Sequence, residues 1–293
     1  MRLLRYSTES SSARIGIGSD DGIVDVGRAA AKAGVEVPDT MHGLLADPYW
    51  REKASIVTDH AARDPDAVVD RSAATLHAPV ADPEKVVCVG LNYEEHIRES
   101  DEEAPENPIL FSKFPSAVAG PNDAITWDPE LTSQVDFEAE LAVVIGETAR
   151  RVDRAGAEAA VAGYTVANDV SARDLQFSDE QWVRGKTLDT FCPLGPNLVT
   201  ADELGDPHEL DIWTEVNGER LQESTTGDLI FDVPELVSFC SQAFTLSPGD
   251  VILTGTPPGV GAFRDPPVYL EAGDEVEVGI EGVGTLANTC AYL

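Results

Sequence analysis

The chain has 293 residues, of which 42% are hydrophobic, and carries 53 Asp and Glu against 20 Lys and Arg. The formal charge of -33 excludes nucleic acid and anionic membranes as partners, because both would repel the protein. Repeated Val, Ile and Leu runs argue against disorder, and four scattered cysteines without a CxxC pair predict neither a zinc site nor a disulfide framework.

The acidic residues run from end to end instead of forming a tail, and only five of the basic residues are lysines. This composition is typical of a surface that stays hydrated in concentrated salt, and our hypothesis is a halophilic, salt-in microbe. The first residues lack the apolar core of a signal peptide, and no apolar run is long enough to span a membrane. We therefore predict a cytoplasmic protein.

Residues 1–80 predict a small N-terminal α/β domain. Strand-like segments open the chain, and helices are expected at Arg28 to Ala33 and near Gly43 to Val57. Prolines punctuate the segment from Pro79 to Pro83, which indicates a domain boundary. A larger domain is expected over residues 81–293.

Strand patterns dominate the larger domain. A buried strand is predicted at Lys85 to Val89, and helices at Arg154 to Ala162 and Val233 to Phe244. Asn217 and Gly218 lie between two strand-like runs, which is a strong signal for a hairpin. The pattern favours an α+β fold with a mostly antiparallel sheet over a doubly wound fold.

The stretch VDFEAELAVVIG places Asp136, Glu138 and Glu140 at alternate positions. Alternate side chains of a strand project to one side, so the three carboxylates would line one short edge. Such a group needs solvent, protonation or a metal ion to offset its repulsion. In so acidic a chain, a solvated strand face explains the pattern equally well.

The segment GYTVANDVSARDLQ ends a predicted strand at Asn168 and Asp169, and Arg173 and Gln176 follow. An acid at a strand end next to a cation is typical of a binding site, although an Asx turn with a surface ion pair is the alternative. Hard divalent cations prefer oxygen ligands. Asp169 could therefore join the strand carboxylates in a metal site.

Two further segments contain polar residues in turns. Lys186 follows Gly185 in RGKTLDTFCPLGP, and Thr256 lies in the Gly/Pro loop LTGTPPGVG. An exposed, solvated lysine is the simpler interpretation of the first. The second allows close approach of the backbone to a ligand but lacks the spacing of a phosphate loop.

His96 and Glu99 lie three residues apart in GLNYEEHIRES, just after a predicted strand. If this loop forms a helical turn, both side chains face the same way. A histidine oriented by a carboxylate can act as a general base near neutral pH. An exposed histidine in a mobile acidic loop is the alternative.

Together these segments resemble the fumarylacetoacetate hydrolase family. The resemblance covers Lys85 to Asn288 and rests on GLNYEEH, DFEAELAVVIG, GYTVANDVSARD, RGKTLDTFCPLGP and TGTPPGVG in this order. It implies a mixed β-roll or β-sandwich domain, a homodimer, and action on 2-oxo or 1,3-diketo acids. The N-terminal part is shorter than in the enzyme that names the family, and in size the chain is closer to acylpyruvate hydrolases, oxaloacetate decarboxylases and the isomerase/decarboxylases of 2-oxo-dienoates.

The resemblance also implies roles for individual residues. It implies Glu138, Glu140 and Asp169 as ligands of Mg²⁺, Mn²⁺ or Ca²⁺, with Asp136 supporting them. By the same resemblance the substrate oxygens should be bound by Arg173, Gln176, Lys186 and Thr256. The catalytic group should comprise His96, Glu99 and Lys186, the first two on a mobile lid.

These expectations lead to a functional hypothesis. We predict a metal-dependent hydrolase that cleaves a C–C bond in acylpyruvate-like diketo acids, as in aromatic catabolism. The alternatives within enzymes are an isomerase or decarboxylase of 2-oxo-dienoates and an oxaloacetate decarboxylase. A non-catalytic protein that binds a cation or a 2-oxo acid would use the carboxylates but would not need His96 and Lys186.

Overall fold

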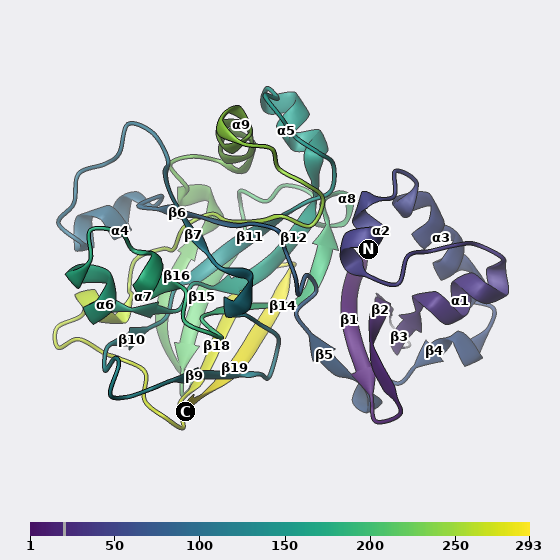
Figure 1. The fold of residues 1–293 in the computed structure, drawn as a ribbon, viewed down its shortest axis with the longest axis horizontal. Helices are drawn as coiled ribbons and strands as arrows, with labels where there is room; N and C mark the ends of the chain where they lie inside the picture. The colour runs from purple at the N-terminus through teal and green to yellow at the C-terminus, as the bar shows by residue number, and fades with distance from the viewer. Residues whose placement is uncertain (20–21) are drawn as a thin grey trace.

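The computed structural model describes residues 1–19 and 22–293, which form an α+β fold around two large β-sheets (Figure 1). The strands along the larger sheet are, in spatial order, β4 (Val68–Val69), β3 (Gly22–Asp25), β2 (Ser11–Ser19), β1 (Arg2–Thr8), β14 (Cys192–Thr200), β12 (Val161–Asn168), β11 (Ala139–Ile145), β17 (Val251–Leu253), β6 (Val86–Gly90) and β7 (Ile109–Lys113). Two short strands join it at the side, β5 (Thr75–His77) on β1 and β8 (Val118–Ala119) on β14. All strand pairs except β17 with β6 and β8 with β14 run antiparallel in this sheet of the described residues.

A second sheet has the order β16 (Glu219–Thr225), β15 (Asp211–Val216), β18 (Glu275–Ile280), β19 (Gly284–Tyr292) and β9 (Ala124–Trp127). The predicted hairpin joins β15 to β16. Asn217 and Gly218 have φ angles of 52° and 79°, which is the left-handed conformation that a two-residue hairpin turn requires. The predicted α+β class and its mostly antiparallel pairing are confirmed.

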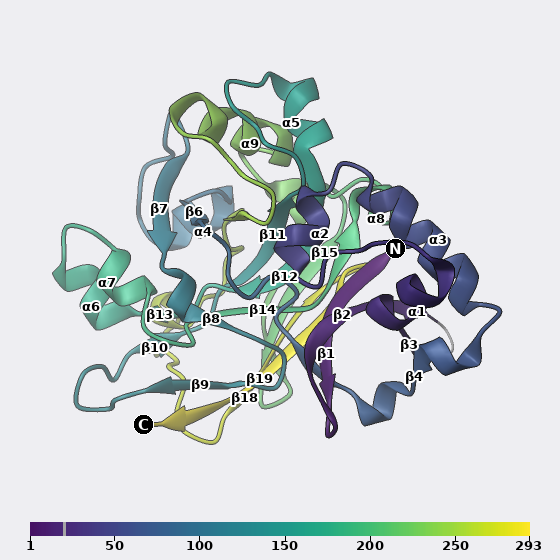
Figure 2. The same ribbon diagram turned by 45° about the vertical axis from the view of Figure 1, so that its right-hand side comes forward.

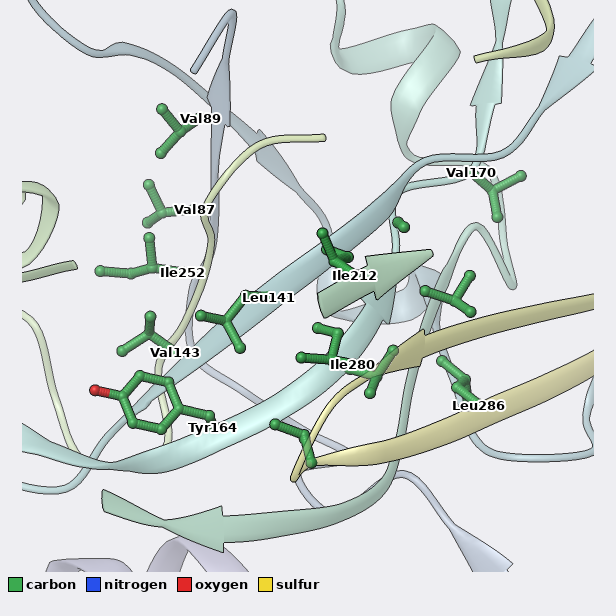
Figure 3. Packing of buried hydrophobic residues seen from close by; sticks show 14 of the residues in the cluster. Val87, Val89, Leu141, Val143, Tyr164, Val170, Ile212, Ile252, Ile280 and Leu286 are labelled. Atoms are coloured by element: carbon green, nitrogen blue, oxygen red, sulfur yellow. The ribbon is translucent and has the colours of Figure 1, made fainter. Parts of the chain in front are cut away.

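The main hydrophobic core lies between the two sheets (Figure 3). Leu141 and Val143 of β11 face Ile212 and Ile280 of the second sheet across this core. The intervening Ala142 and Val144 belong to a different cluster on the other side of β11. Both faces of β11 are therefore buried, which explains why its sequence contains the continuous apolar run LAVVI.

The N-terminal segment adds its strands to the same sheet, because β1 pairs with β14. Its helices are α1 (Val26–Ala33), α2 (Met41–Ala46) and α3 (Trp50–Ala61), which Figures 1 and 2 show beside β1. The single helix expected near Gly43 to Val57 is divided in two, because Asp47 ends α2 and accepts a hydrogen bond from the backbone N–H of Tyr49. The division at residue 80 stays a prediction.

The remaining helices are α4 (Glu94–Glu99), α5 (Arg154–Ala160), α6 (Arg173–Ser178), α7 (Val183–Lys186), α8 (Ala201–Leu204) and α9 (Val233–Ala243). The last two predicted helices are confirmed, although α5 stops two residues early because Val161 begins β12. Helices α5 and α9 lie side by side, and α6 and α7 lie together at the left edge of both views (Figures 1 and 2). Among the described residues, none of the helices has the length and apolarity to cross a membrane.

Candidate active site

Three buried carboxylates converge where β11 begins and β12 ends. The antiparallel register places Ala139 opposite Asn168, so Glu138 and Glu140 flank the end of β12 and meet Asp169. The backbone N–H of Asp169 donates to the Glu138 carbonyl at 2.9 Å. One oxygen from each of the three acids lies within 4.8 Å of the others, and all three residues are buried. The structure thus brings together the predicted metal ligands. The alternative interpretation, a solvated strand face, is wrong because the three acids are buried.

Three buried cations surround these acids. Lys186 Nζ lies 2.7 Å from Glu138 and 3.0 Å from Asp169. Arg173 contacts the other oxygen of Glu138 at 2.7 Å. Lys113 Nζ lies 2.5 Å from Asp169. The expectations of an exposed Lys186 and of a surface ion pair at Arg173 are therefore wrong, since each side chain is buried.

The charges shift the pKa values of these groups in different directions. Burial alone would raise the pKa of Glu138, but the positive charges of Lys186 and Arg173 outweigh it and hold that pKa well below its ordinary value. Burial would lower the pKa of Lys186, yet the neighbouring acids raise it overall, so this side chain is an ammonium ion. Burial, followed by the repulsion of Asp169 and Glu138, raises the pKa of Glu140 well above its ordinary value.

The donor set fits a hard divalent cation. All three candidate ligands are carboxylates, which Mg²⁺, Mn²⁺ and Ca²⁺ prefer. Glu140 accepts a hydrogen bond from the Gly255 N–H through one oxygen at 2.7 Å, and it has no ion-pair partner within the described ranges. An additional cation would offset this charge, which is the physical reason to expect a metal here.

Asp136 is kept apart from this group. It lies on β10 (Val135–Asp136), which pairs with β13 (Ser171–Ala172) in a separate two-stranded ladder. Its carboxylate accepts hydrogen bonds from Arg173 Nε at 2.8 Å and from the backbone N–H groups of Gly261 and Ala262 at 2.8 and 2.9 Å. Asp136 thereby holds Arg173 in place, and its role in supporting the metal ligands stays a prediction.

His96 and Glu99 lie on α4, and the predicted mobile lid stays a prediction. His96 Nδ1 and Glu99 Oε1 are 2.7 Å apart, and the imidazole side chain is only 9% exposed. The other Glu99 oxygen accepts the Gly259 N–H at 2.9 Å, so α4 contacts the loop after β17. The predicted helical turn is confirmed, and the exposed-histidine alternative is wrong.

Seven of the predicted site residues line one cavity of about 120 Å³, whereas Glu99, Asp169, Asp136 and Lys113 do not. These seven are His96, Glu138, Glu140, Arg173, Gln176, Lys186 and Thr256, and Ser100 and Glu102 add to the polar lining. Four aromatic side chains also line the cavity, namely Phe111, Phe177, Trp182 and Phe263. Gln176 accepts a hydrogen bond from Arg173 at 2.9 Å, so its amide is oriented by the same guanidinium that holds Glu138.

Sequence reasoning missed Lys113 and the aromatic wall. Lys113 ends β7 and is fully buried, where it also donates to the carbonyl oxygens of Val170 and Lys186. Its only signal in the sequence is the scarcity of lysine. The aromatic residues come from four separate segments, so no local pattern joins them.

Residues 85–291 match the family described as fumarylacetoacetate (FAA) hydrolase C-terminal. The chain belongs to this family. It is 55% identical over 223 residues to oxaloacetate tautomerase FAHD2B, mitochondrial, of Bos taurus, which covers 75% of this chain and 71% of that protein. The resemblance found in the motifs is therefore confirmed.

Solved structures of the fumarylacetoacetate hydrolase family support the same assignment. The fumarylacetoacetate hydrolase of psychrophilic Exiguobacterium antarcticum has 38% identity and a TM-score of 0.82, with 100% of both chains covered. The maleylpyruvate hydrolase of Sphingobium sp. SYK-6 has 33% identity and a TM-score of 0.80, also over 100% of both chains. The chain is an enzyme of this family, and its relatives include tautomerases and hydrolases.

The cytoplasmic prediction is contradicted by these relatives. The oxaloacetate tautomerases of Bos taurus and Homo sapiens, 55% and 52% identical to the chain, are both named as mitochondrial. The prediction rested on the lack of a long apolar segment. A search for apolar segments detects signals for secretion and membrane insertion. It does not detect signals for organelle import, because these are amphipathic and not apolar.

Proposed function

We propose that the protein is a divalent-metal-dependent tautomerase that interconverts the keto and enol forms of oxaloacetate or a similar short 2-oxo acid. The observation that carries this proposal is the convergence of three acids, an ammonium ion and a histidine–glutamate pair around one small cavity. The similarity to oxaloacetate tautomerases supports it further. This reaction replaces C–C bond hydrolysis as our first choice.

The size of the cavity favours a short acid. A volume of about 120 Å³ is that of a few water molecules. The rings of Phe111 and Trp182, which line the cavity, pack edge to face at 5.4 Å. We take the small volume to favour a four-carbon acid over an extended 2-oxo-dienoate.

The residues have complementary tasks in this proposal. A divalent cation held by Glu138, Glu140 and Asp169 would supply Lewis-acid polarisation of the 2-oxo group. Lys186 stays protonated and adds positive charge where the oxygen becomes negative, a contribution of about 3 kcal/mol for a well-placed donor. Neither task moves a proton, so a separate acid–base group is needed.

His96 is that group. With Nδ1 against Glu99, the imidazole keeps its N–H on that side and leaves Nε2 free to accept a proton. In ketonisation the enol O–H loses a proton and C3 gains one. His96 Nε2 takes up and returns this proton, and Glu99 stabilises the imidazolium that forms in between.

Hydrolysis of a diketo acid is the second candidate. The maleylpyruvate hydrolase similar to this chain supports it, and the same His96–Glu99 pair could deprotonate a water molecule. The two reactions differ in their products, because only hydrolysis breaks a C–C bond. The predicted homodimer and the choice among Mg²⁺, Mn²⁺ and Ca²⁺ stay predictions.

The deciding experiment mixes the purified protein and Mg²⁺ with freshly dissolved enol-oxaloacetate and follows the loss of enol absorbance. We expect faster ketonisation than in buffer, and suppression by a chelator. Parallel assays measure pyruvate release from acetylpyruvate and decarboxylation of oxaloacetate. Faster pyruvate release without faster ketonisation would establish the hydrolase instead, and no acceleration in any assay would support the non-catalytic binding protein.

A further inference from the structure

Gln222 of β16 is a buried amide that stands behind the cavity wall. It is 1% exposed and does not line the cavity. Its Oε1 accepts hydrogen bonds from the Ala139 N–H at 2.9 Å and the Thr214 hydroxyl at 2.7 Å. Its Nε2 donates to Thr256 Oγ1 and to the Pro257 carbonyl, both at 2.8 Å. The amide is thus saturated.

Two backbone groups determine which way this amide points. The N–H of Ala139 can only donate, so it must face Oε1. The carbonyl of Pro257 can only accept, so it must face Nε2. Rotating the amide by 180° would place like groups against each other at both positions, and the orientation of Gln222 is therefore unambiguous.

This orientation determines what Thr256 can offer to a ligand. Its hydroxyl oxygen already accepts the Gln222 N–H, so the single hydroxyl proton must point elsewhere. Within residues 1–19 and 22–293, no hydrogen bond has this hydroxyl as donor. Thr256 is 4% exposed and lines the cavity together with Arg173 and Lys186. The proton is therefore available to an oxygen inside the cavity.

We propose that Gln222 is a positioning residue that presents the Thr256 hydroxyl as a donor and so selects substrates with an accepting carboxylate at that point. The same amide accepts a hydrogen bond from the backbone N–H of Ala139, which lies between Glu138 and Glu140. Gln222 therefore connects the Thr256 hydroxyl to the strand of the proposed metal ligands. The inference rests on the proposed function for its substrate class, a 2-oxo acid. The inference can be tested separately from the proposed function, because the binding of oxalate can be measured without turnover.

The test uses Gln222→Glu, which has nearly the same shape. The new carboxylate still accepts from Ala139 and Thr214, but the oxygen that replaces Nε2 accepts the Thr256 proton and turns a lone pair of that hydroxyl toward the cavity. The same oxygen faces the Pro257 carbonyl, which loses its donor, and a Thr256→Val background separates this second effect. We expect the affinity for oxalate, measured by calorimetry with Mg²⁺ present, to fall about tenfold or more. In turnover, KM should rise by a similar factor while kcat changes less than about threefold.

Two comparisons separate positioning from a general loss of structure. Thr214→Val removes a hydrogen bond from the far side of the same amide, and we expect unchanged oxalate affinity even if the melting temperature falls. Thr256→Val removes the donor itself. In that background Gln222→Glu should have no further effect on oxalate binding, because the two residues act through one hydroxyl.

Gln222→Met is the second variant if Gln222→Glu fails to fold, since it removes the amide N–H without adding charge. It should weaken oxalate binding in the wild-type background and not in Thr256→Val. Wild-type affinity for oxalate in either folded Gln222 variant would overturn the inference. The inference would also be overturned if the Gln222 substitutions lowered the affinity for oxalate equally in the wild-type and Thr256→Val backgrounds. If only the proposed tautomerase reaction fails, these binding measurements still decide the inference about Gln222.

Discussion

Lys113 and Asp169 form an ion pair, with 2.5 Å between Nζ and Oδ1, in which neither side chain is exposed to solvent. The same ammonium group donates to the Val170 carbonyl at 2.9 Å and to the carbonyl of Lys186. It thereby joins the end of β7 to two segments that carry proposed site residues. One buried cation holds together three parts of the chain.

We expect Lys113→Met to destabilise the protein by about 3 kcal/mol or more, because Asp169 loses a buried partner and two carbonyl groups lose a donor. Urea denaturation measures the change. Lys32→Met is the matched control, since Lys32 pairs with Asp64 at the surface and its side chain is 39% exposed. Equal stability of the two variants would contradict this role of Lys113.

Replacing a proposed metal ligand should weaken metal binding without unfolding the protein. We expect Glu138→Gln and Asp169→Asn each to lower the affinity for Mn²⁺ about a hundredfold, because each removes a charged oxygen ligand. Titration calorimetry gives the affinity. Glu102→Gln is the control, because Glu102 lines the cavity but lies outside the group of three acids. Native affinity in either ligand variant would refute its assignment.

His96→Ala should retain metal and oxalate binding while losing about 10²–10⁴ in kcat, because it removes only the group that moves the proton. Stopped-flow measurement of enol absorbance gives kcat, and calorimetry gives the two affinities. His60→Ala, on the exposed side of α3, should behave as wild type. Turnover at the wild-type rate would exclude His96 from the acid–base role.

Asp25 should make stability depend on pH. Burial would raise the pKa of this carboxyl, but hydrogen bonds from the Arg28 N–H, Arg14 and Tyr6 outweigh it and lower the pKa below its usual value of 3.8. The folded state therefore gains stability above that value and loses it as the pH falls through the lower, folded-state pKa. We expect Asp25→Asn to be less stable than wild type at neutral pH.

The difference between wild type and Asp25→Asn should shrink as the pH falls below 3.8, because both side chains are then neutral. Urea denaturation at a series of pH values measures it. Asp39→Asn changes an exposed acid and provides the control. A difference that stays constant with pH would show that the charge of Asp25 contributes nothing.

The charge of -33 should make folding depend on salt. At low ionic strength the acids repel one another across the surface, and salt screens this repulsion. We expect the free energy of unfolding to be markedly higher in about 3 M KCl than in about 0.1 M KCl. Full stability and complete refolding in dilute buffer would contradict the halophilic hypothesis.

Local patterns in the sequence were sufficient for much of the fold. The turn at Asn217 and Gly218, the helix α9 and the pairing of His96 with Glu99 each depend on residues a few positions apart. Such short-range geometry follows from the backbone conformation that the residues prefer. The extra break between α2 and α3 was missed, because it depends on a cap at Asp47.

By itself the sequence determined the class of fold, the family and the residue types that could bind a cation, because period, turn chemistry and motif order are local properties. Only the tertiary structure decided that Asp169 meets Glu138, that Lys113 is buried beside them and that Gln222 orients Thr256. These contacts join residues 31 to 56 positions apart. They depend on strand register, which decides which side chains meet, and on burial, which shifts the pKa of each charged group. No local pattern in the sequence encodes either.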